Sequence, residues 1–204
     1  AVVAMFDAAE AKFGVVDTII NNAGMTHEKN ALTQDIEEFR KIMDLNVTSV
    51  WCVAREGARR LIKAGADVSA RGRVVNIASV HGLVASANKA PYVASKFGIV
   101  GLSKVAALEY AAAGSRDSGG VTVNCICPGW VETPLIEPQI EARRSGLPQG
   151  NATRDDGVRA LLAEKQPSLR MSLPEDIASM VLWLCRREAH NVTGASFPID
   201  GGWT

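Results

Sequence analysis

The sequence predicts an α/β fold in which helices cover both faces of a parallel β-sheet. Segments rich in β-branched residues alternate along the chain with segments whose apolar residues recur at helical spacing. The predicted strands are also apolar on both faces, as buried parallel strands usually are. A β-sandwich would need closely spaced turn signals, which this sequence lacks.

The chain begins with a helix and a strand. Residues 1–13 have amphipathic spacing, and Gly14 is a typical helix stop. Residues 15–20 are largely β-branched and lead into Asn21-Asn22-Ala23-Gly24, whose composition favours a loop. We expect this loop to follow the first strand of the sheet directly.

A long helix and a second strand come next. Thr33 or Asp35 can cap a helix over residues 36–54, in which apolar side chains repeat at helical intervals. Residues 73–78 contain two adjacent valines and an isoleucine, and they form the next predicted strand.

The second half of the chain continues the alternation. A helix begins near Pro91, a residue that the first turn tolerates, and extends to about Gly114. Residues 121–126 form the third strand, which Cys127-Pro128-Gly129 closes. Residues 172–175 read Ser-Leu-Pro-Glu, a capping-box pattern that opens a helix, and residues 195–199 form a short last strand.

One stretch differs from this alternation. Residues 138–157 are polar and contain glycine and proline, directly after a strand end. We expect a mobile lid here, lying over the carboxyl edge of the sheet as part of a substrate-loop region of about 134–170. The alternative is a solvated surface insertion.

The composition narrows the function. A chain of 204 residues suits one domain, residues 1–204, and its formal net charge of zero favours neither nucleic acid nor an anionic membrane as a partner. The apolar runs are too short to span a membrane. The four cysteines lie in apolar stretches, and Cys125-Ile126-Cys127 is too tight for a zinc site. We therefore expect free thiols in a reducing, cytoplasmic compartment and no metal.

The spacing of Ser79, Tyr92 and Lys96 suits proton transfer. Tyr92 and Lys96 are four residues apart, so they share one face of the predicted helix. A phenol normally titrates near ~10, and a nearby ammonium is expected to lower the pKa of Tyr92 toward neutrality. Ser79 lies at a predicted strand end, from which its hydroxyl can reach the same point. Because parallel strands end at one edge, loops 21–24, 79–82 and 128–133 should meet there.

The segment Asn21-Asn22-Ala23-Gly24, Asn46 within a helix, Ser79 with Tyr92 and Lys96, and Pro128-Gly129 before Thr133 form an ordered set. In order and spacing they resemble the motifs of the short-chain dehydrogenase/reductase family, over essentially the whole chain. The resemblance implies a Rossmann-type doubly wound sheet and a catalytic tetrad of Asn46, Ser79, Tyr92 and Lys96. It also implies hydride transfer to a nicotinamide cofactor.

The resemblance further implies which residues hold the cofactor: Asn22, Ala23, Gly24, Tyr92, Lys96, Pro128, Gly129, Val131 and Thr133. The family's Gly-rich phosphate turn and its ribose-reading acidic residue find no counterpart here. We therefore expect the first βαβ half to lie upstream of residue 1, an N-terminally truncated form of the fold. NAD is the expected cofactor, and NADP stays open because the residue that distinguishes them lies in that half.

Within the family, residues 76–89, 127–131, 161–168 and 200–203 resemble the corresponding segments of the bacterial D-3-hydroxybutyrate dehydrogenases. That resemblance implies a small hydroxy or keto acid as substrate, a homotetramer, and a substrate pocket of Ser79, His81, Lys89, Tyr92, Trp130, Gln166 and Trp203. One position departs from the pattern, because Thr26 stands where those enzymes carry a glutamine that helps hold the carboxylate. A shorter side chain could admit a longer or different acid.

Plainer interpretations compete with these assignments. Asn46 could mark a helix kink or a structural hydrogen bond, and His81 could be a structural histidine. Gln166 could end a helix, and Trp203 could pack at a subunit contact. The alternative functions are an NADP-dependent 3-oxoacyl or other ketone reductase of the family, and a non-catalytic fragment that only assembles through its helices.

Overall fold

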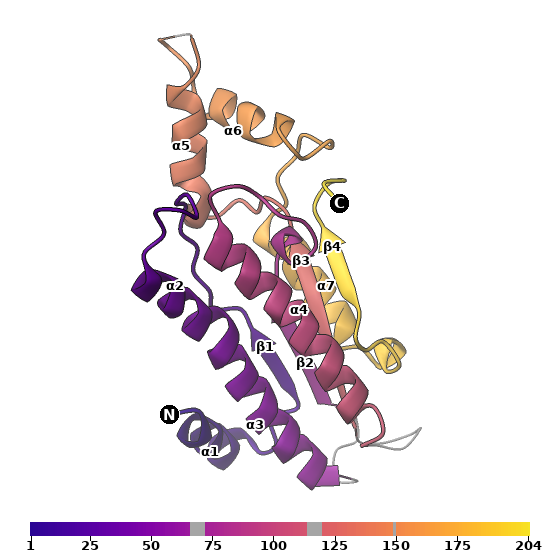
Figure 1. The fold of residues 1–204 in the computed structure, drawn as a ribbon. Coiled ribbons are helices and arrows are strands. Elements are labelled where there is room, and N and C mark those ends of the chain that lie inside the picture. Colours follow the sequence, from indigo (N-terminus) through magenta and orange to yellow (C-terminus); the bar gives the residue numbers. More distant parts are fainter. Residues whose placement is uncertain (66–71, 114–119, 149) are drawn as a thin grey trace.

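The computed structural model describes residues 1–65, 72–113, 120–148 and 150–204, and within them four strands form one parallel sheet in the order β1-β2-β3-β4 (Figure 1). The strands are β1 (Thr18–Asn21), β2 (Gly72–Ile77), β3 (Val121–Pro128) and β4 (Ser196–Ile199). Asn21 is level with Asn76, Asn76 with Cys125, and Cys125 with Ser196. This register brings the carboxyl ends of the strands to one edge, which confirms the predicted parallel α/β fold.

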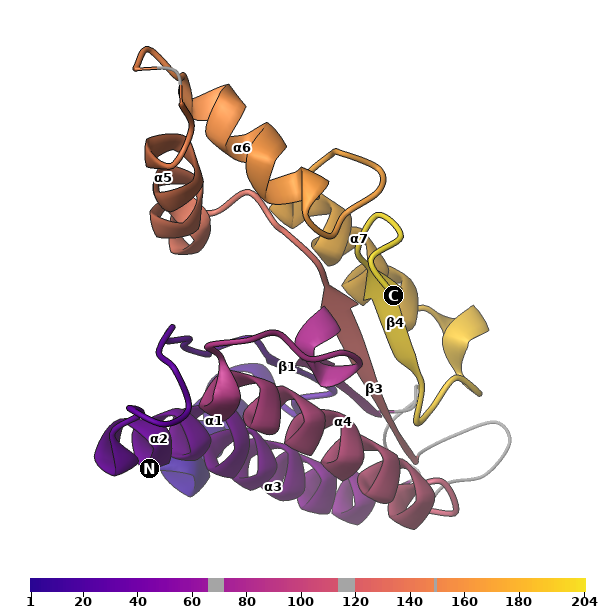
Figure 2. The ribbon, with the colours of Figure 1, turned by 45° about the horizontal axis from the view of Figure 1, so that its top comes forward.

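Helices cover both faces of the sheet (Figure 2). On one face lie α3 (Ser49–Ala64) and α4 (Ala90–Tyr110), preceded by α2 (Ile36–Met43), and on the other lies α7 (Pro174–Leu184). Neighbouring strand residues alternate between these faces: Val74 packs with Ala58 and Leu61 of α3, whereas Val75 packs with Leu184 of α7. The alternation explains why the strands are apolar on both sides.

The first helix, α1 (Val2–Phe13), packs beside α3 and ends at Gly14, as its sequence predicts. Phe6 is its buried residue and belongs to the same core cluster as Leu61. Arg60 of α3 lies 2.6 Å from Asp7 and 2.5 Å from Glu10, so ion pairs hold the two helices together along their exposed edge.

The helix expected over residues 36–54 is interrupted. Asp35 caps α2 by accepting hydrogen bonds from the backbone amides of Glu37 and Glu38. A π-helical turn over Asp44–Thr48 then separates α2 from α3. The extra residue in that turn places Asn46 fully inside the protein, where its amide forms hydrogen bonds outside its own helix.

The cap of α7 differs from the predicted one by one residue. Asp176 accepts a hydrogen bond of 2.7 Å from the backbone amide of Leu173, so the capping side chain is Asp176 and not Glu175. The helix begins at Pro174, whose missing amide proton is not needed in the first turn. The predicted end of the helix after Pro91, near Gly114, lies outside the described residues.

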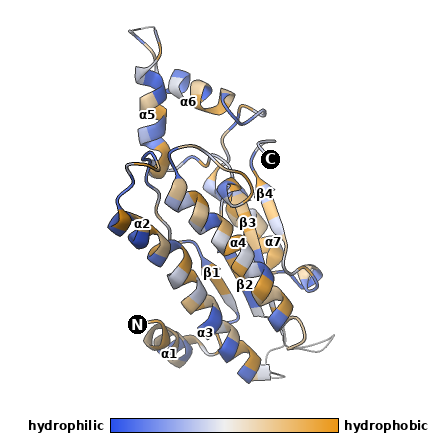
Figure 3. Cartoon of the chain, in the orientation of Figure 1, coloured by the Kyte–Doolittle hydropathy of each residue, from blue (hydrophilic) through white to orange (hydrophobic). Residues whose placement is uncertain are grey.

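The polar stretch after β3 is helical. A short 3-10 turn, η4 (Pro134–Ile136), leads into α5 (Glu137–Ser145), and α6 (Arg154–Ala163) returns beside it beyond the carboxyl edge of the sheet. Figure 3 shows polar residues along much of α5, in contrast to the apolar β3. Ile136, Ile140 and Leu161 nevertheless form a small core of their own. The mobility of this region remains a prediction. Within the described ranges, no helix has the length and apolarity needed to cross a membrane.

Candidate active site

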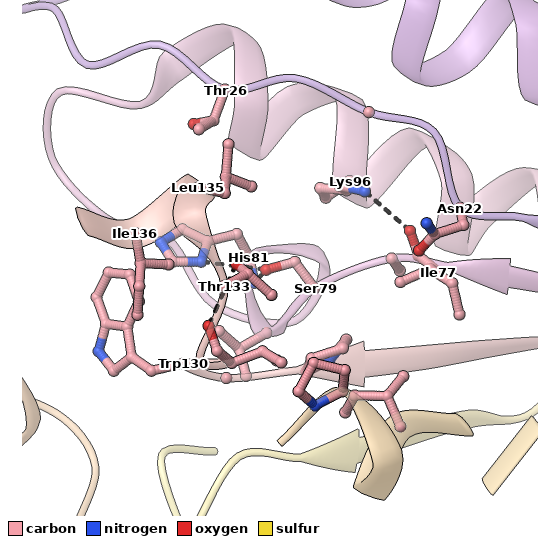
Figure 4. A pocket seen from close by; sticks show the side chains of 18 of the residues that line it. Asn22, Thr26, Ile77, Ser79, His81, Lys96, Trp130, Thr133, Leu135 and Ile136 are labelled. Carbon is pink, nitrogen blue, oxygen red and sulfur yellow. Dashed lines mark hydrogen bonds between the residues drawn. The ribbon is translucent and has the colours of Figure 1, made fainter. Parts of the chain in front are cut away.

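A cavity of about 720 Å³ opens at the carboxyl edge of the sheet. The strand ends, the start of α4, η4 and α7 supply its walls. Figure 4 shows Ser79, His81 and Thr133 close together, with Lys96 and Asn22 on one side and Trp130 and Ile136 on the other. Most predicted site residues line this cavity: Asn22, Gly24, Ser79, His81, Lys89, Tyr92, Lys96, Pro128, Gly129, Trp130, Val131, Thr133 and Trp203.

Ser79 and Tyr92 lie close together in the cavity wall. Ser79 follows β2 and caps the short η3 turn (Val80–Gly82), where its Oγ accepts a hydrogen bond of 3.2 Å from the His81 amide. Tyr92 lies in the first turn of α4 and lines the same cavity. Burial raises the pKa of Tyr92, and a hydrogen bond with the Ser79 hydroxyl acts in the opposite direction.

Lys96 follows Tyr92 by one turn of α4 and is almost completely buried. Its Nζ donates a hydrogen bond of 2.8 Å to the carbonyl oxygen of Ile77 and lies 5.5 Å from the centre of the Tyr92 ring. The expectation that Lys96 lowers the pKa of Tyr92 is not met in the protein alone, because burial dominates at the phenol. Burial also lowers the pKa of Lys96, to about 8.

Asn46 lies behind this group and does not line the cavity. Its Oδ1 accepts from the Met25 amide at 2.9 Å, and its Nδ2 donates to the Met25 carbonyl at 2.8 Å and to Ser95 Oγ at 3.0 Å. Asn46 therefore fixes the loop after β1 to α4. These contacts agree with the structural hydrogen bonds that the sequence left as one alternative, and the catalytic role of Asn46 stays a prediction.

The opposite end of the cavity is built from aromatic rings and a cation. The ring centres of His81 and Trp203 are 5.4 Å apart, and those of Trp203 and Trp130 are 5.5 Å apart. Lys89 Nζ lies 5.2 Å from the centre of the Trp130 ring. Such a corner combines an apolar surface with a buried positive charge, which suits a small organic anion.

His81 is neutral near pH 7. Burial, followed by the charges of Lys89 and Lys165, lowers its pKa to about 4. Its Nδ1 lies 3.4 Å from Ser79 Oγ, whereas the buried Nε2 has no hydrogen-bond partner among the described residues. When Nδ1 accepts from the Ser79 hydroxyl, Nε2 carries the proton as a buried donor.

Besides Asn46, two further predicted residues are placed outside the cavity wall, Ala23 and Gln166. Gln166 is buried, and its side-chain oxygen accepts from the backbone amide of Trp130 at 3.2 Å, while its nitrogen donates to the Arg170 carbonyl. Both ends of the amide are therefore occupied by the chain itself, and Gln166 supports Trp130 from behind.

The residues at the Lys96 end fit a nicotinamide nucleotide. Lys96 Nζ uses one of its three donors on the Ile77 carbonyl, and it lines the cavity, so it can offer the others to ribose hydroxyls. Gly24 lies beside this ammonium, since a Cβ at Gly24 would be in ordinary contact with Lys96 Nζ, at 3.7 Å. Within the described residues, no group of His, Cys, Asp and Glu side chains could hold a metal ion.

Comparison with known proteins shows the family of the chain. A family model described as enoyl-(acyl carrier protein) reductase matches residues 1–204. D-beta-hydroxybutyrate dehydrogenases from Cupriavidus necator and Rhizobium meliloti are 41% and 38% identical over 98% and 95% of this chain, which spans 72% and 69% of their own lengths. The chain belongs to the short-chain dehydrogenase/reductase family.

Relatives within this family act on several hydroxy compounds. Cis-4-hydroxycyclohexanecarboxylate dehydrogenase of Sinomonas cyclohexanicum is 34% identical over the whole chain, which covers 72% of that enzyme. Among solved structures, 4-hydroxyisoleucine dehydrogenase complexed with NADH superposes with a TM-score of 0.81 at 31% identity, with all of this chain matched to 74% of that one. This match confirms that the chain has the predicted Rossmann-like arrangement.

The structure adds residues that the sequence analysis did not assign to the site. Leu135 and Ile136 from η4 and Ile177 from α7 give the cavity an apolar wall. Glu28, in the loop after β1, lies 2.9 Å from Lys89 Nζ. Only the spacing of α7 carried a sequence signal, because the other contacts depend on how the loops fold over the sheet edge.

Proposed function

We propose that this chain catalyses the oxidation of a short 3-hydroxy acid to the corresponding keto acid, with D-3-hydroxybutyrate as substrate and NAD as hydride acceptor. One observation carries the proposal: Tyr92, the proton-transfer group, and Lys89, a buried cation suited to a carboxylate, line the same cavity. The similarity to two D-beta-hydroxybutyrate dehydrogenases, at 41% and 38% identity, supports the choice of acid.

In the proposed mechanism, Ser79 holds the substrate hydroxyl and Tyr92 removes its proton as the carbon loses hydride. Bound NAD would accept the hydride, and the positive charge of its ring would favour the Tyr92 phenolate. Lys96 would hold the ribose hydroxyls of NAD at a fixed distance from Tyr92, because its third contact is the Ile77 carbonyl. Asn46 keeps the neighbouring loop in place.

The remaining predicted residues divide between the two ligands. Asn22, Ala23 and Gly24 would face the adenosine side of NAD, and the segment Pro128–Thr133 would frame the nicotinamide. Lys89 would bind the substrate carboxylate as a point charge, His81 would donate from Nε2, and Trp130 and Trp203 would enclose the short apolar chain.

Initial rates of NAD reduction test the proposal. We expect D-3-hydroxybutyrate to give a far higher kcat/KM than the L enantiomer, and NAD to be preferred over NADP. Lys89→Gln should raise KM for the acid at least tenfold while kcat changes little, because one charge–charge contact is lost in the ground state and the transition state alike. Turnover of a 3-oxoacyl thioester with NADPH, without turnover of the acid, would support the alternative reductase instead.

We also propose that the protein is a cytoplasmic homotetramer whose helices α3 and α4 form one of the subunit contacts. Trp51, Phe97 and Leu108 on these helices are exposed by 44%, 45% and 81%. Large apolar side chains gathered on neighbouring helices are typical of a surface that another subunit covers. Light scattering should give four chains per particle, and Phe97→Glu should yield smaller particles.

The substrate-loop region of about 134–170 is proposed to cover the cavity when both ligands are bound. It carries Leu135 and Ile136, which line the cavity, and its polar helices extend beyond the sheet edge. Hydrogen exchange should slow in α5 when NADH and acetoacetate are added together. Unchanged exchange in α5 would contradict a lid.

A further inference from the structure

The cavity cation Lys89 has a partner within the chain. Glu28 Oε1 lies 2.9 Å from Lys89 Nζ, and the Lys89 side chain is only 10% exposed, against 43% for Glu28. Backbone contacts hold the two segments together, because the Lys29 amide donates to the Asn88 carbonyl at 2.8 Å. The ion pair is therefore fixed by the fold and is not a chance contact between two long side chains.

Positive charge predominates around this ion pair. Among the described residues that line the cavity, the charged side chains are Lys89 and Lys96, and Glu28 contacts Lys89 from outside the wall. Burial acts against ionisation of Glu28, but the hydrogen bond and charge of Lys89, helped by Gln139 and Arg143 of α5, lower the pKa of Glu28. Glu28 is thus an anion at neutral pH, and it reduces the net positive charge around Lys89.

We propose that Glu28 is a specificity-determining residue: it competes with the substrate carboxylate for Lys89 and so sets how strongly the site prefers acids over neutral hydroxy compounds. The inference rests on the proposed function, in which Lys89 anchors the acid group. A carboxylate that reaches Lys89 must share the ammonium with a second carboxylate and is repelled by it. A neutral substrate meets no such repulsion.

Glu28 acts through Lys89, so it is a positioning residue, and its effect should depend on the charge of the ligand. The test compares D-3-hydroxybutyrate with its uncharged methyl ester, using dissociation constants from calorimetry so that turnover is not required. Glu28→Gln keeps the size and an oxygen that accepts from Lys89 but removes the charge. The matched control is Glu38→Gln, since Glu38 belongs to the adjoining helix and pairs with His27 of the same loop at 3.2 Å.

We expect Glu28→Gln to tighten binding of the acid about tenfold, as removal of one like charge at a partly exposed site should. Binding of the methyl ester should stay within about twofold, and Glu38→Gln should leave both ligands unchanged. The KM for the acid should fall in parallel while kcat does not change. A purely structural role would alter both ligands together and would overturn the inference.

Two other outcomes separate the inference from the proposed function. If Lys89→Gln weakens binding of the acid but Glu28→Gln leaves that binding unchanged or weaker, Glu28 does not compete with the substrate. Lys89 then still stands as the anchor of the carboxylate. If Lys89→Gln does not affect binding of the acid, the anchor itself is wrong, and the inference falls with it.

Discussion

The Lys96 ammonium donates a 2.8 Å hydrogen bond to the carbonyl oxygen of Ile77, the last residue of β2. This contact ties the first turns of α4 to the strand end that also carries Ser79. It fixes the distance between the tyrosine on the helix and the serine after the strand. The contact therefore holds Ser79, Tyr92 and Lys96, the proposed proton-transfer groups, in one arrangement.

Removal of the Tyr92 hydroxyl should abolish most of the activity. Tyr92→Phe keeps the ring, so we expect kcat to fall by on the order of 10²- to 10⁴-fold with little change in the affinity for the acid. Tyr110→Phe is the matched control, because Tyr110 is the chain's other tyrosine and lies at the far end of α4. Comparable losses in both variants would count against Tyr92 as the acid–base group.

His81 should make the protein less stable in acid. Its pKa is lowered from 6.5 to about 4 in the folded chain, so between these values the unfolded chain binds more protons. The contribution of His81 to the free energy of unfolding is fully present above about pH 6.5. It is lost as the pH drops toward 4, which lowers the stability by up to about 3 kcal/mol. His81→Gln should flatten that part of a urea-unfolding series. His190→Gln, at an exposed histidine, should leave the slope as it is.

Asn46 should matter for the stability of the loop after β1. Asn46→Ala leaves the Met25 amide and carbonyl without their partners, at a cost of about 1–3 kcal/mol. Urea unfolding measures the loss, and hydrogen exchange should quicken at the Met25 amide. Asn30→Ala is the control, since Asn30 is exposed and water can replace its contact with the Leu32 amide. Equal effects of the two changes would contradict the anchoring role.

Gly82 should not tolerate a side chain. A Cβ at this position would lie 2.9 Å from the Lys96 carbonyl oxygen and 2.9 Å from Val100 Cγ2, so Gly82→Ala must push η3 away from α4. We expect a loss of about 1–3 kcal/mol by thermal unfolding, and a lower kcat because Ser79 and His81 move with the turn. In Gly146→Ala the nearest atoms are at 3.5 Å, and both quantities should stay near wild type.

The local sequence predicted most of the secondary structure. Strand and helix order followed from residue type and spacing, and the helix stop at Gly14 was found where expected. The prediction was poorer where tertiary contacts decide. The π-helical turn over Asp44–Thr48 serves the buried amide of Asn46, and α5 and α6 form around an apolar cluster too sparse to recognise in a polar stretch.

By itself, the sequence determined which groups meet at the site, because Ser79, Tyr92 and Lys96 have fixed spacings on elements whose parallel order brings them to one edge. Only the tertiary structure decided the environment of these groups. Burial raises the pKa of Tyr92 although a lysine lies one turn away, and the fold of the loop after β1 brings Glu28 to Lys89. Spacing along the chain fixes neighbours on one element, whereas burial and contacts between loops depend on the whole packed molecule.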